Sequence, residues 1–249
     1  MYLTTQGLVL RVCPYNDTDA MLTILTAEHG RISAKVRGLR RKNSPLSAPC
    51  QLLVYGEFTF FEYKGNYTVN EAHSLELFAE LRNDLQKLSL GTYFAQVAEV
   101  ISQEDLPNPE LLSLTLNCLF ALSKLGVSEA KAKAVFEIRC SCLAGYTPDL
   151  IGCRVCGSRQ PEFFDISGGR LECAGCRSVD SSGIRMPVTA GILEAMGYLC
   201  NCDPKRLFSF ELPDSTIQQL SSISESYLAA QLERGFSALD FYKSLIFIS

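Results

Sequence analysis

The stretch that decides the fold of the second half is Cys153-Arg-Val-Cys156, answered by Cys173-Ala-Gly-Cys176. Two Cys-x-x-Cys pairs at this separation have the spacing of a four-thiolate zinc site, in which each pair places two sulfurs on one tight turn. Between the pairs, Phe163-Phe-Asp-Ile166 and Arg170-Leu-Glu172 flank a Ser-Gly-Gly turn, a pattern that predicts a β-hairpin. We therefore predict a zinc ribbon at about residues 150–180, held by structural zinc on Cys153, Cys156, Cys173 and Cys176.

Two disulfides or four ordinary buried thiols would also account for these cysteines. Because all four corners are cysteine, no open ligand position is implied, and we expect the zinc to be structural rather than catalytic. The other seven of the eleven cysteines are expected to act as small hydrophobic residues. Cys200 and Cys202 offer only two ligands, which do not make a second metal cage.

The overall composition describes a globular chain of one large or two medium domains. Its 249 residues are 47% hydrophobic, and the first residues lack the basic and apolar regions of a secretion signal. No apolar run approaches the roughly 18–20 residues that span a bilayer, and an odd number of cysteines fits a reducing compartment. We expect a cytoplasmic protein without a membrane segment. The net charge of −4 does not by itself suggest nucleic acid.

The first 79 residues carry the period-2 alternation and turn residues of an all-β domain. Alternating runs predict strands over about residues 2–12, 20–26, 31–37, 52–63 and 67–71. Five short strands in a segment of this length favour a closed β-barrel of the oligonucleotide-binding (OB) type over residues 1–79.

After Phe78 the hydrophobic period changes from 2 to 3.6, which predicts an α-helical domain over residues 80–249. We expect helices over about 81–101, 111–125, 128–144 and 190–199, a long helix from Pro213 or Asp214, and one more over 236–248. Ser128 and Thr189 are suitable N-caps. The fold class is α+β and multidomain, with the zinc ribbon inserted into the helical domain.

One window breaks the acidic average of the chain. It contains six cations and no acidic residue: Arg31, Lys35, Arg37, Arg40, Arg41 and Lys42. Cations this close repel one another unless a polyanion neutralises them, so the window is a candidate contact for phosphates, although a solvated loop is the alternative. Barrels of this type pair such charges with aromatic stacking. The later aromatic run from Tyr55 to Tyr63 could contribute outward rings, although most are expected in the core.

The order of these parts resembles the RecO family of bacterial recombination-mediator proteins. The matching segments are Gly7-Leu-Val-Leu, Arg37-Gly-Leu-Arg-Arg-Lys-Asn-Ser44, Gly145-Tyr-Thr-Pro-Asp-Leu with the following Cys153-Arg-Val-Cys-Gly157, and Tyr227-Leu with Lys243-Ser-Leu. The likeness extends over nearly the whole chain. Its most specific part is the cysteine quartet joined to the preceding Gly-Tyr-x-Pro-Asp-Leu.

The resemblance implies an N-terminal OB fold, a helical C-terminal domain and a zinc site on the four cysteines. It implies binding of single- and double-stranded DNA through the Arg31–Lys42 window, strand annealing, and work with RecR to load RecA. It also implies contact with the C-terminal tail of single-strand-binding protein. That acidic and hydrophobic tail needs a groove with a basic rim, for which we consider Lys131, Lys133 and Arg139, although Glu129 and Glu137 share their helix.

Two other classes of function remain as alternatives. A zinc-dependent nucleic-acid-modifying enzyme such as a base deaminase needs a His-x-Glu motif and a Pro-Cys-x-x-Cys motif, and the sequence has neither. No Walker loop or dinucleotide-type glycine motif is present, so we expect a protein that is not an enzyme. A zinc-ribbon RNA-binding or transcription factor that uses the same barrel is the remaining alternative.

Overall fold

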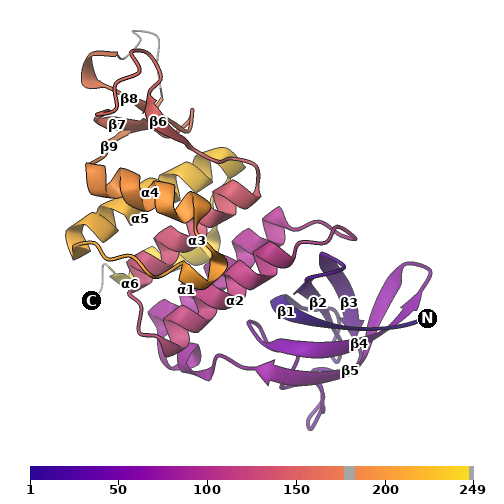
Figure 1. Cartoon of the computed structure of the whole chain (residues 1–249). Helices are drawn as coiled ribbons and strands as arrows, with labels where there is room; N and C mark the ends of the chain where they lie inside the picture. The colour runs from indigo at the N-terminus through magenta and orange to yellow at the C-terminus, as the bar shows by residue number, and fades with distance from the viewer. Residues whose placement is uncertain (177–182, 247–249) are drawn as a thin grey trace. The chain divides into compact units, whose positions relative to one another are not determined.

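The computed structural model describes residues 1–176 and 183–246, and it divides into two compact units. Unit 1 is Met1–Gly126 together with the segment that begins at Phe236, and unit 2 is Val127–Gly235. Figure 1 shows the strands β1–β5 of unit 1 and the helices α3–α5 of unit 2. The predicted domain boundary after residue 79 stays a prediction.

Five strands of unit 1 form a closed barrel in the order β1-β2-β3-β5-β4. Every pairing is antiparallel except that of β3 with β5, which is parallel and has only two residue pairs. This arrangement confirms the predicted OB-like barrel. The strands are β1 (Tyr2–Pro14), β2 (Ala20–Thr26), β3 (Arg31–Val36), β4 (Tyr55–Tyr63) and β5 (Asn66–Glu76).

The alternating residues of these strands fill the barrel. On β3, Ile32, Ala34 and Val36 are buried while the residues between them face outward, as the period of 2 predicts. Phe58 and Phe60 are fully buried in the same core, and their rings lie 6.0 Å apart. The residues between these buried positions on β3 and β4 therefore lie on the outside of the barrel.

The helices of unit 1 begin at capping residues. The Asp84 carboxylate accepts from the amides of Gln86 and Lys87 at the start of α1, and the Asn108 side chain caps α2 in the same way. The elements are η1 (Ala79–Asn83), α1 (Leu85–Ile101), α2 (Pro109–Lys124) and α6 (Ser237–Ile246). The expected end of the last helix at residue 248 lies outside the described residues.

The 3.6-residue apolar pattern predicts one buried stripe along η1 and α1, formed by Leu81, Leu85, Leu88, Ala95, Ala98 and Ile101, and this prediction is wrong in part. Leu85 is 54% exposed, whereas Leu90, Phe94 and Val97 are buried. The reason is that α1 has two packed sides, since it contacts β1 and β2 as well as α2 and α6. A single stripe counted from the start of the apolar pattern does not describe a helix that is buried on several sides.

In its described residues, unit 2 has three α-helices, two short 3-10 helices and a small sheet. The α-helices are α3 (Glu129–Leu143), α4 (Ala190–Asn201) and α5 (Asp214–Leu232), and the 3-10 helices are η2 (Ala174–Cys176) and η3 (Pro204–Arg206). The expected N-caps are present, since Ser128 accepts from the amide of Lys131 and Thr189 from that of Ile192. α3 packs against both α4 and α5.

The small sheet has the strand order β6-β8-β7-β9 (Figure 1). The expected hairpin is present as β7 (Phe163–Asp165) and β8 (Arg170–Glu172), and β6 (Asp149–Cys153) and β9 (Arg185–Pro187) extend it on either side. The ring of Phe164 lies 5.2 Å from that of Tyr227 on α5, so the sheet is anchored to the helices of unit 2. Residues 177–180 of the predicted ribbon lie outside the described residues.

Candidate nucleic-acid interface and metal centre

Four cysteine sulfurs of unit 2 converge on one point. Cys153 ends β6, Cys176 ends the short helix η2 (Ala174–Cys176), and the ligand atoms of all four cysteines lie within 4.8 Å of one another. Tetrahedral zinc with Zn–S bonds of about 2.3 Å has S···S edges of about 3.8 Å. The sulfurs of Cys156 and Cys173 are 3.7 Å apart, so the cage has the size of such a site and could hold a metal ion.

Backbone amides prepare Cys153 to act as a thiolate. The amides of Cys156, Cys173 and Val155 point at its sulfur, and these hydrogen bonds lower the pKa of the Cys153 thiol to about 6. The amide of Cys173 lies 3.4 Å from that sulfur. A sulfur that accepts several N–H groups is favoured in the charged form that binds metals.

An arginine from the edge strand β9 supports the second cysteine pair. The guanidinium of Arg185 donates to the carbonyl of Cys173 at 3.0 Å, lies 3.0 Å from the Glu172 carboxylate, and stacks 4.7 Å from the ring of Phe163. Arg185 is not one of the four cage residues, but its contacts hold the turn that carries Cys173 in place.

The basic window of unit 1 separates into two groups. Arg31 and Lys35 face carboxylates: Arg31 lies 4.0 Å from Glu104, and Lys35 lies 3.0 Å from Asp19. The remaining four cations are exposed and form no ion pair within the described residues; we call them the basic loop, namely Arg37, Arg40, Arg41 and Lys42. The positive charge available to a ligand is therefore concentrated on the loop that follows β3.

Asp19, on the turn between β1 and β2, holds the basic loop in place. Its carboxylate accepts from the amide of Gly38 at 2.8 Å and from the ammonium of Lys35 at 3.0 Å. The Gly38 amide has the larger effect and the Lys35 ammonium the next, and together they hold the pKa of Asp19 well below its ordinary value. The same turn binds Arg40, whose amide donates to the carbonyl of Thr18 at 2.9 Å.

We expect Asp19→Ala to weaken the binding of single-stranded DNA roughly two- to tenfold, although the change removes a negative charge. Without Asp19 the basic loop is not held in place, and ordering it on binding costs part of the binding free energy.

The pKa of Asp19 is lower in the folded chain than in the unfolded chain. Its contribution to folding stability is therefore fully present above the unfolded pKa and is lost only as the pH falls through the folded pKa. The amide of Gly38 should thus stay protected from hydrogen exchange at about pH 4 in the unmodified chain.

The control is Asp17→Ala, which removes an equal charge from an exposed position on the same turn. It should leave DNA binding unchanged or slightly tighter. If Asp19→Ala also binds more tightly at every salt concentration, charge alone accounts for Asp19 and the ordering role is excluded.

The aromatic run of β4 has some outward rings, as predicted, but the expectation that most of its rings lie in the core is wrong, because Tyr55 is only half-buried and two others are exposed. Phe58 and Phe60 are buried, whereas Phe61 and Tyr63 are exposed on the outer face of β4. The ring of Tyr2 on β1 lies 5.5 Å from that of Phe61. Exposed rings on the outside of a barrel that also carries a cationic loop are available for base stacking.

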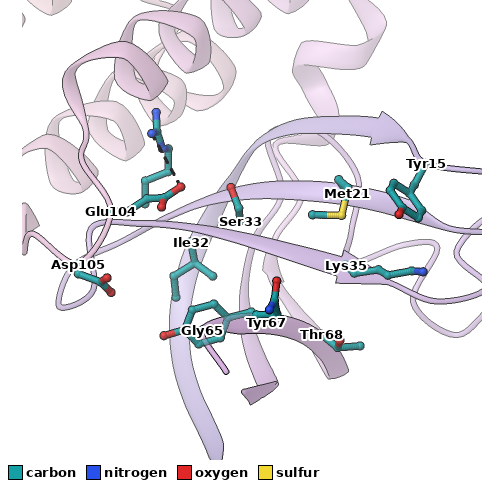
Figure 2. A pocket seen from close by; sticks show the side chains of 12 residues that line it. Tyr15, Met21, Ile32, Ser33, Lys35, Gly65, Tyr67, Thr68, Glu104 and Asp105 are labelled. Carbon is teal, nitrogen blue, oxygen red and sulfur yellow. Dashed lines mark ion pairs between the residues drawn. The ribbon is translucent and has the colours of Figure 1, made fainter. Parts of the chain in front are cut away.

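A groove lies beside the two-pair junction of β3 and β5. Its volume is 430 Å³, within the range of about 300–1,000 Å³ that is common for small-ligand sites. Figure 2 shows Tyr15 and Lys35 at one end of this groove, Glu104 and Asp105 at the other, and Tyr67 between them on β5. Lys35 lies 4.6 Å from the ring centroid of Tyr15.

The three cations predicted to rim a partner-binding groove have structural contacts in unit 2. The ammonium of Lys131 lies over the ring of Phe210 at 4.7 Å, and Arg139 donates to the carbonyls of Leu199 and Cys200 at 3.1 Å each. Lys133 is buried and bonded to acidic and serine side chains. The three therefore do not form one exposed surface, and their role in binding a partner stays a prediction.

Sequence reasoning missed the residues that organise the interface. Asp19, Glu104 and Asp105 come from connections outside the basic window. The run Asn16-Asp-Thr-Asp19 indicates a turn, and the Asn16 side chain does accept from the amides of Thr18 and Asp19. Nothing in this run identifies the loop that Asp19 contacts.

Among the described helices, none combines the length and the apolar character that a membrane-spanning helix needs.

Comparison with known proteins agrees with this arrangement. The family model "Recombination protein O N terminal" matches residues 1–78, and "Recombination protein O C terminal" matches residues 82–240. The chain is 34% identical to a protein named DNA repair protein RecO of Acetivibrio thermocellus, over 98% of this chain and 97% of that one. It is 29% identical to the protein of the same name from Alkaliphilus metalliredigens, over 98% and 100%. With a closed barrel, a helical part and a cysteine cage in the matching order, the chain belongs to the RecO family of DNA repair proteins.

Proposed function

We propose that this protein is a non-enzymatic recombination mediator that binds and anneals single-stranded DNA. The observation that supports this most directly is the basic loop, since four exposed cations without ion-pair partners in the described residues follow β3 of an OB-like barrel. Phosphate contacts depend on the local density of lysine and arginine, so a net charge of −4 is no obstacle.

Annealing follows from the same charges. Two complementary strands repel each other through their phosphates, and a cationic loop that binds one strand lowers the repulsion on the second. The exposed rings of Tyr2, Phe61 and Tyr63 lie on the barrel that carries the loop and are available to unstacked bases. We propose that the basic loop holds the backbone while the bases stay free to pair.

We propose zinc as the metal of the cysteine cage, because four thiolates at this spacing are the preferred ligands of structural zinc. When bound, the metal would cross-link the turns that carry Cys153 and Cys173. The cage has no ligand position for a water molecule, so its role is to stabilise the ribbon rather than to act in catalysis.

We further propose that the protein acts with RecR to replace single-strand-binding protein by RecA, and that it contacts the tail of single-strand-binding protein. These roles rest on membership of the RecO family and on the single-strand surface of unit 1. A zinc-ribbon RNA-binding or transcription factor is the second candidate, favoured only by the ribbon itself.

The experiment that separates these candidates is annealing of complementary DNA oligonucleotides, with and without single-strand-binding protein. A mediator accelerates annealing in both conditions, and pull-down recovers single-strand-binding protein. An RNA-binding factor would instead prefer RNA oligonucleotides and leave the coated DNA strands apart.

We expect Arg37→Ala, Arg40→Ala and Arg41→Ala together to weaken DNA binding and flatten its salt dependence. Each phosphate contact on a single strand contributes about 0.7 to the slope of log K against log salt, so the slope should fall by about 2. Fluorescence anisotropy of a labelled oligonucleotide across a salt series measures this. The matched control replaces three exposed cations of unit 2, Arg159, Lys205 and Arg206, with alanine. Equal slopes in the unmodified chain and the basic-loop variant would remove this loop from the DNA interface.

A further inference from the structure

Three cysteines outside the metal cage lie together where α3 and α4 end. Cys142 is the second-last residue of α3, Cys200 is the second-last residue of α4, and Cys202 is the C-cap of α4. All three are free and half-buried, so a small reagent can reach them. Figure 1 shows α3 and α4 among the helices of unit 2. The fold thus brings Cys142 and Cys200 together although they are 58 positions apart in the sequence.

Arg139 joins the ends of these two helices. It lies one turn before Cys142 on α3, and its guanidinium donates to the carbonyls of Leu199 and Cys200 at 3.1 Å each. The last carbonyls of a helix lack partners within the helix, so a guanidinium from a neighbouring helix is a suitable donor for them. Residues three apart share a face of an α-helix. The same contact therefore fixes Cys200 against the face of α3 that carries Cys142.

The thiols of Cys142 and Cys200 interact across this contact. The hydrogen bond from Cys200 is the largest effect on the Cys142 thiol, and with smaller contributions from Thr147 and the charge of Arg139 it outweighs burial and lowers the pKa of Cys142 to about 7. The interaction raises the pKa of Cys200. Near neutral pH, Cys142 is therefore partly a thiolate while Cys200 keeps its proton. A reactive thiolate beside a second thiol is the arrangement of redox-active cysteine pairs.

The other groups that face the pair are protonated near neutral pH. The Cys202 thiol donates to the carbonyl of Leu199 at 4.0 Å, and burial raises its pKa. Tyr227 on α5 donates to the carbonyl of Tyr146 at 2.9 Å, and burial raises the pKa of Tyr227 to about 12. Among these groups Cys142 is therefore the nucleophile.

We propose that Cys142 and Cys200 form a reversible oxidation site, which hydrogen peroxide converts into a disulfide between α3 and α4. The Cys142 thiolate attacks one peroxide oxygen, the O–O bond breaks, and the hydroxide that leaves takes up a proton to become water. Cys142 is then a sulfenic acid. The Cys200 sulfur attacks the sulfenic sulfur, and the hydroxyl group leaves with the Cys200 proton as a second water. A dithiol reductant restores both thiols by thiol–disulfide exchange.

This disulfide would close a loop that contains the ribbon. The chain between Cys142 and Cys200 includes β6 to β9 and all four cysteines of the cage. The bond would therefore join the segments that enter and leave the ribbon, whether or not a metal is bound. The inference goes beyond the proposed function, since it depends on no contact with DNA.

The test treats the full chain, purified in the presence of zinc, with hydrogen peroxide and then alkylates the remaining thiols. Peptide mapping by mass spectrometry should find one peptide pair joined between Cys142 and Cys200, lighter by two hydrogen atoms than the separate thiols. After a protease cut within the ribbon, the two halves should stay together on a non-reducing gel and separate when dithiothreitol is added.

Serine variants assign the two roles. Cys200→Ser should lose the crosslink completely and accumulate a sulfenic acid on Cys142 that dimedone traps, whereas Cys142→Ser should lose both. The matched control is Cys202→Ser, which changes the third thiol of the cluster and should keep the crosslink. The peptide map of the unmodified chain decides the result even where a variant is less stable.

Three results would overturn the proposal. The first is that peroxide oxidises only the cage cysteines of the unmodified chain. The second is a disulfide of Cys200 with Cys202 in place of Cys142. The third is a crosslink that persists between the cut halves of Cys142→Ser. None of these results affects the assignment of the basic loop to DNA binding.

Discussion

Cys153→Ser is expected to abolish zinc binding and unfold the ribbon, while α3, α4 and α5 stay folded. Structural zinc contributes about 10–16 kcal/mol of apparent binding free energy in zinc-finger peptides, a value as large as the stability of a whole domain. In the part of the ribbon that the structure describes, the apolar core is small, formed by Phe164, Ile166 and Leu171, and cannot replace that contribution. Zinc content per chain should fall from one to zero, and limited proteolysis should cut between residues 150 and 187 first.

The control for this variant is Cys13→Ser, which makes the same chemical change at a half-buried position outside the cage. It should keep one zinc per chain and the protease resistance of the ribbon. The contact of Phe164 with Tyr227 decides how far the damage spreads. Loss of the helical circular dichroism of unit 2 in Cys153→Ser would show that the ribbon is an integral part of that unit rather than an insertion.

Lys133→Ala is expected to destabilise unit 2 by about 3–5 kcal/mol, the range for breaking a buried ion pair. The Lys133 ammonium lies 3.2 Å from Glu137 and 2.9 Å from Glu225, and it donates to the carbonyl of Ser221 at 3.0 Å. The Glu137 side chain is fully buried, and the hydroxyl of Ser224 also donates to it at 2.6 Å. Removing the ammonium leaves a buried carboxylate without its counter-charge. Urea unfolding monitored by circular dichroism measures the loss.

Two variants distinguish a buried charge from a general packing defect. Lys205→Ala removes an exposed lysine of the same unit and should change the stability by less than about 0.5 kcal/mol. Lys133→Met combined with Glu137→Leu replaces the buried pair by apolar side chains of similar size, while Glu225 is partly exposed to solvent, so this variant should recover the part of the stability lost through the Glu137 charge. If the double variant is as unstable as Lys133→Ala, the loss does not come from the unpaired Glu137 charge.

The sequence predicts the elements of this fold well because their signals are local. Alternation along residues 31–36 and the cap residues Ser128 and Thr189 act within a few positions, and the structure has strands and helices where these patterns place them. β6 and β9 were not predicted. They are short strands whose sequences lack a clear alternation, and their pairing depends on the hairpin and cysteine cage between them.

The cysteine cage could be predicted from local sequence signals, whereas the contacts of the cations could not. The cysteine cage depends on two spacings that the sequence displays directly. The contacts of the cations depend on residues far along the chain: Arg31 meets Glu104, and Lys133 meets Ser221, which is 88 positions away. Periodicity shows which residues share a face of an element, but it does not show what the fold brings against that face.

The last described helix, α6, belongs to unit 1, whose other elements all lie in residues 1–126. Phe236 packs edge-on against Tyr93 with ring centroids 5.4 Å apart, and Gln96 of α1 bonds to Ser237 and to the amide of Ala238. The ribosome makes all of unit 2 before it makes α6. Unit 1 therefore has to wait, with the α6-binding side of α1 uncovered, until unit 2 has been translated. A premature stop just before Phe236 would spare unit 2 with its cysteine cage and leave unit 1, which was synthesised first, without α6.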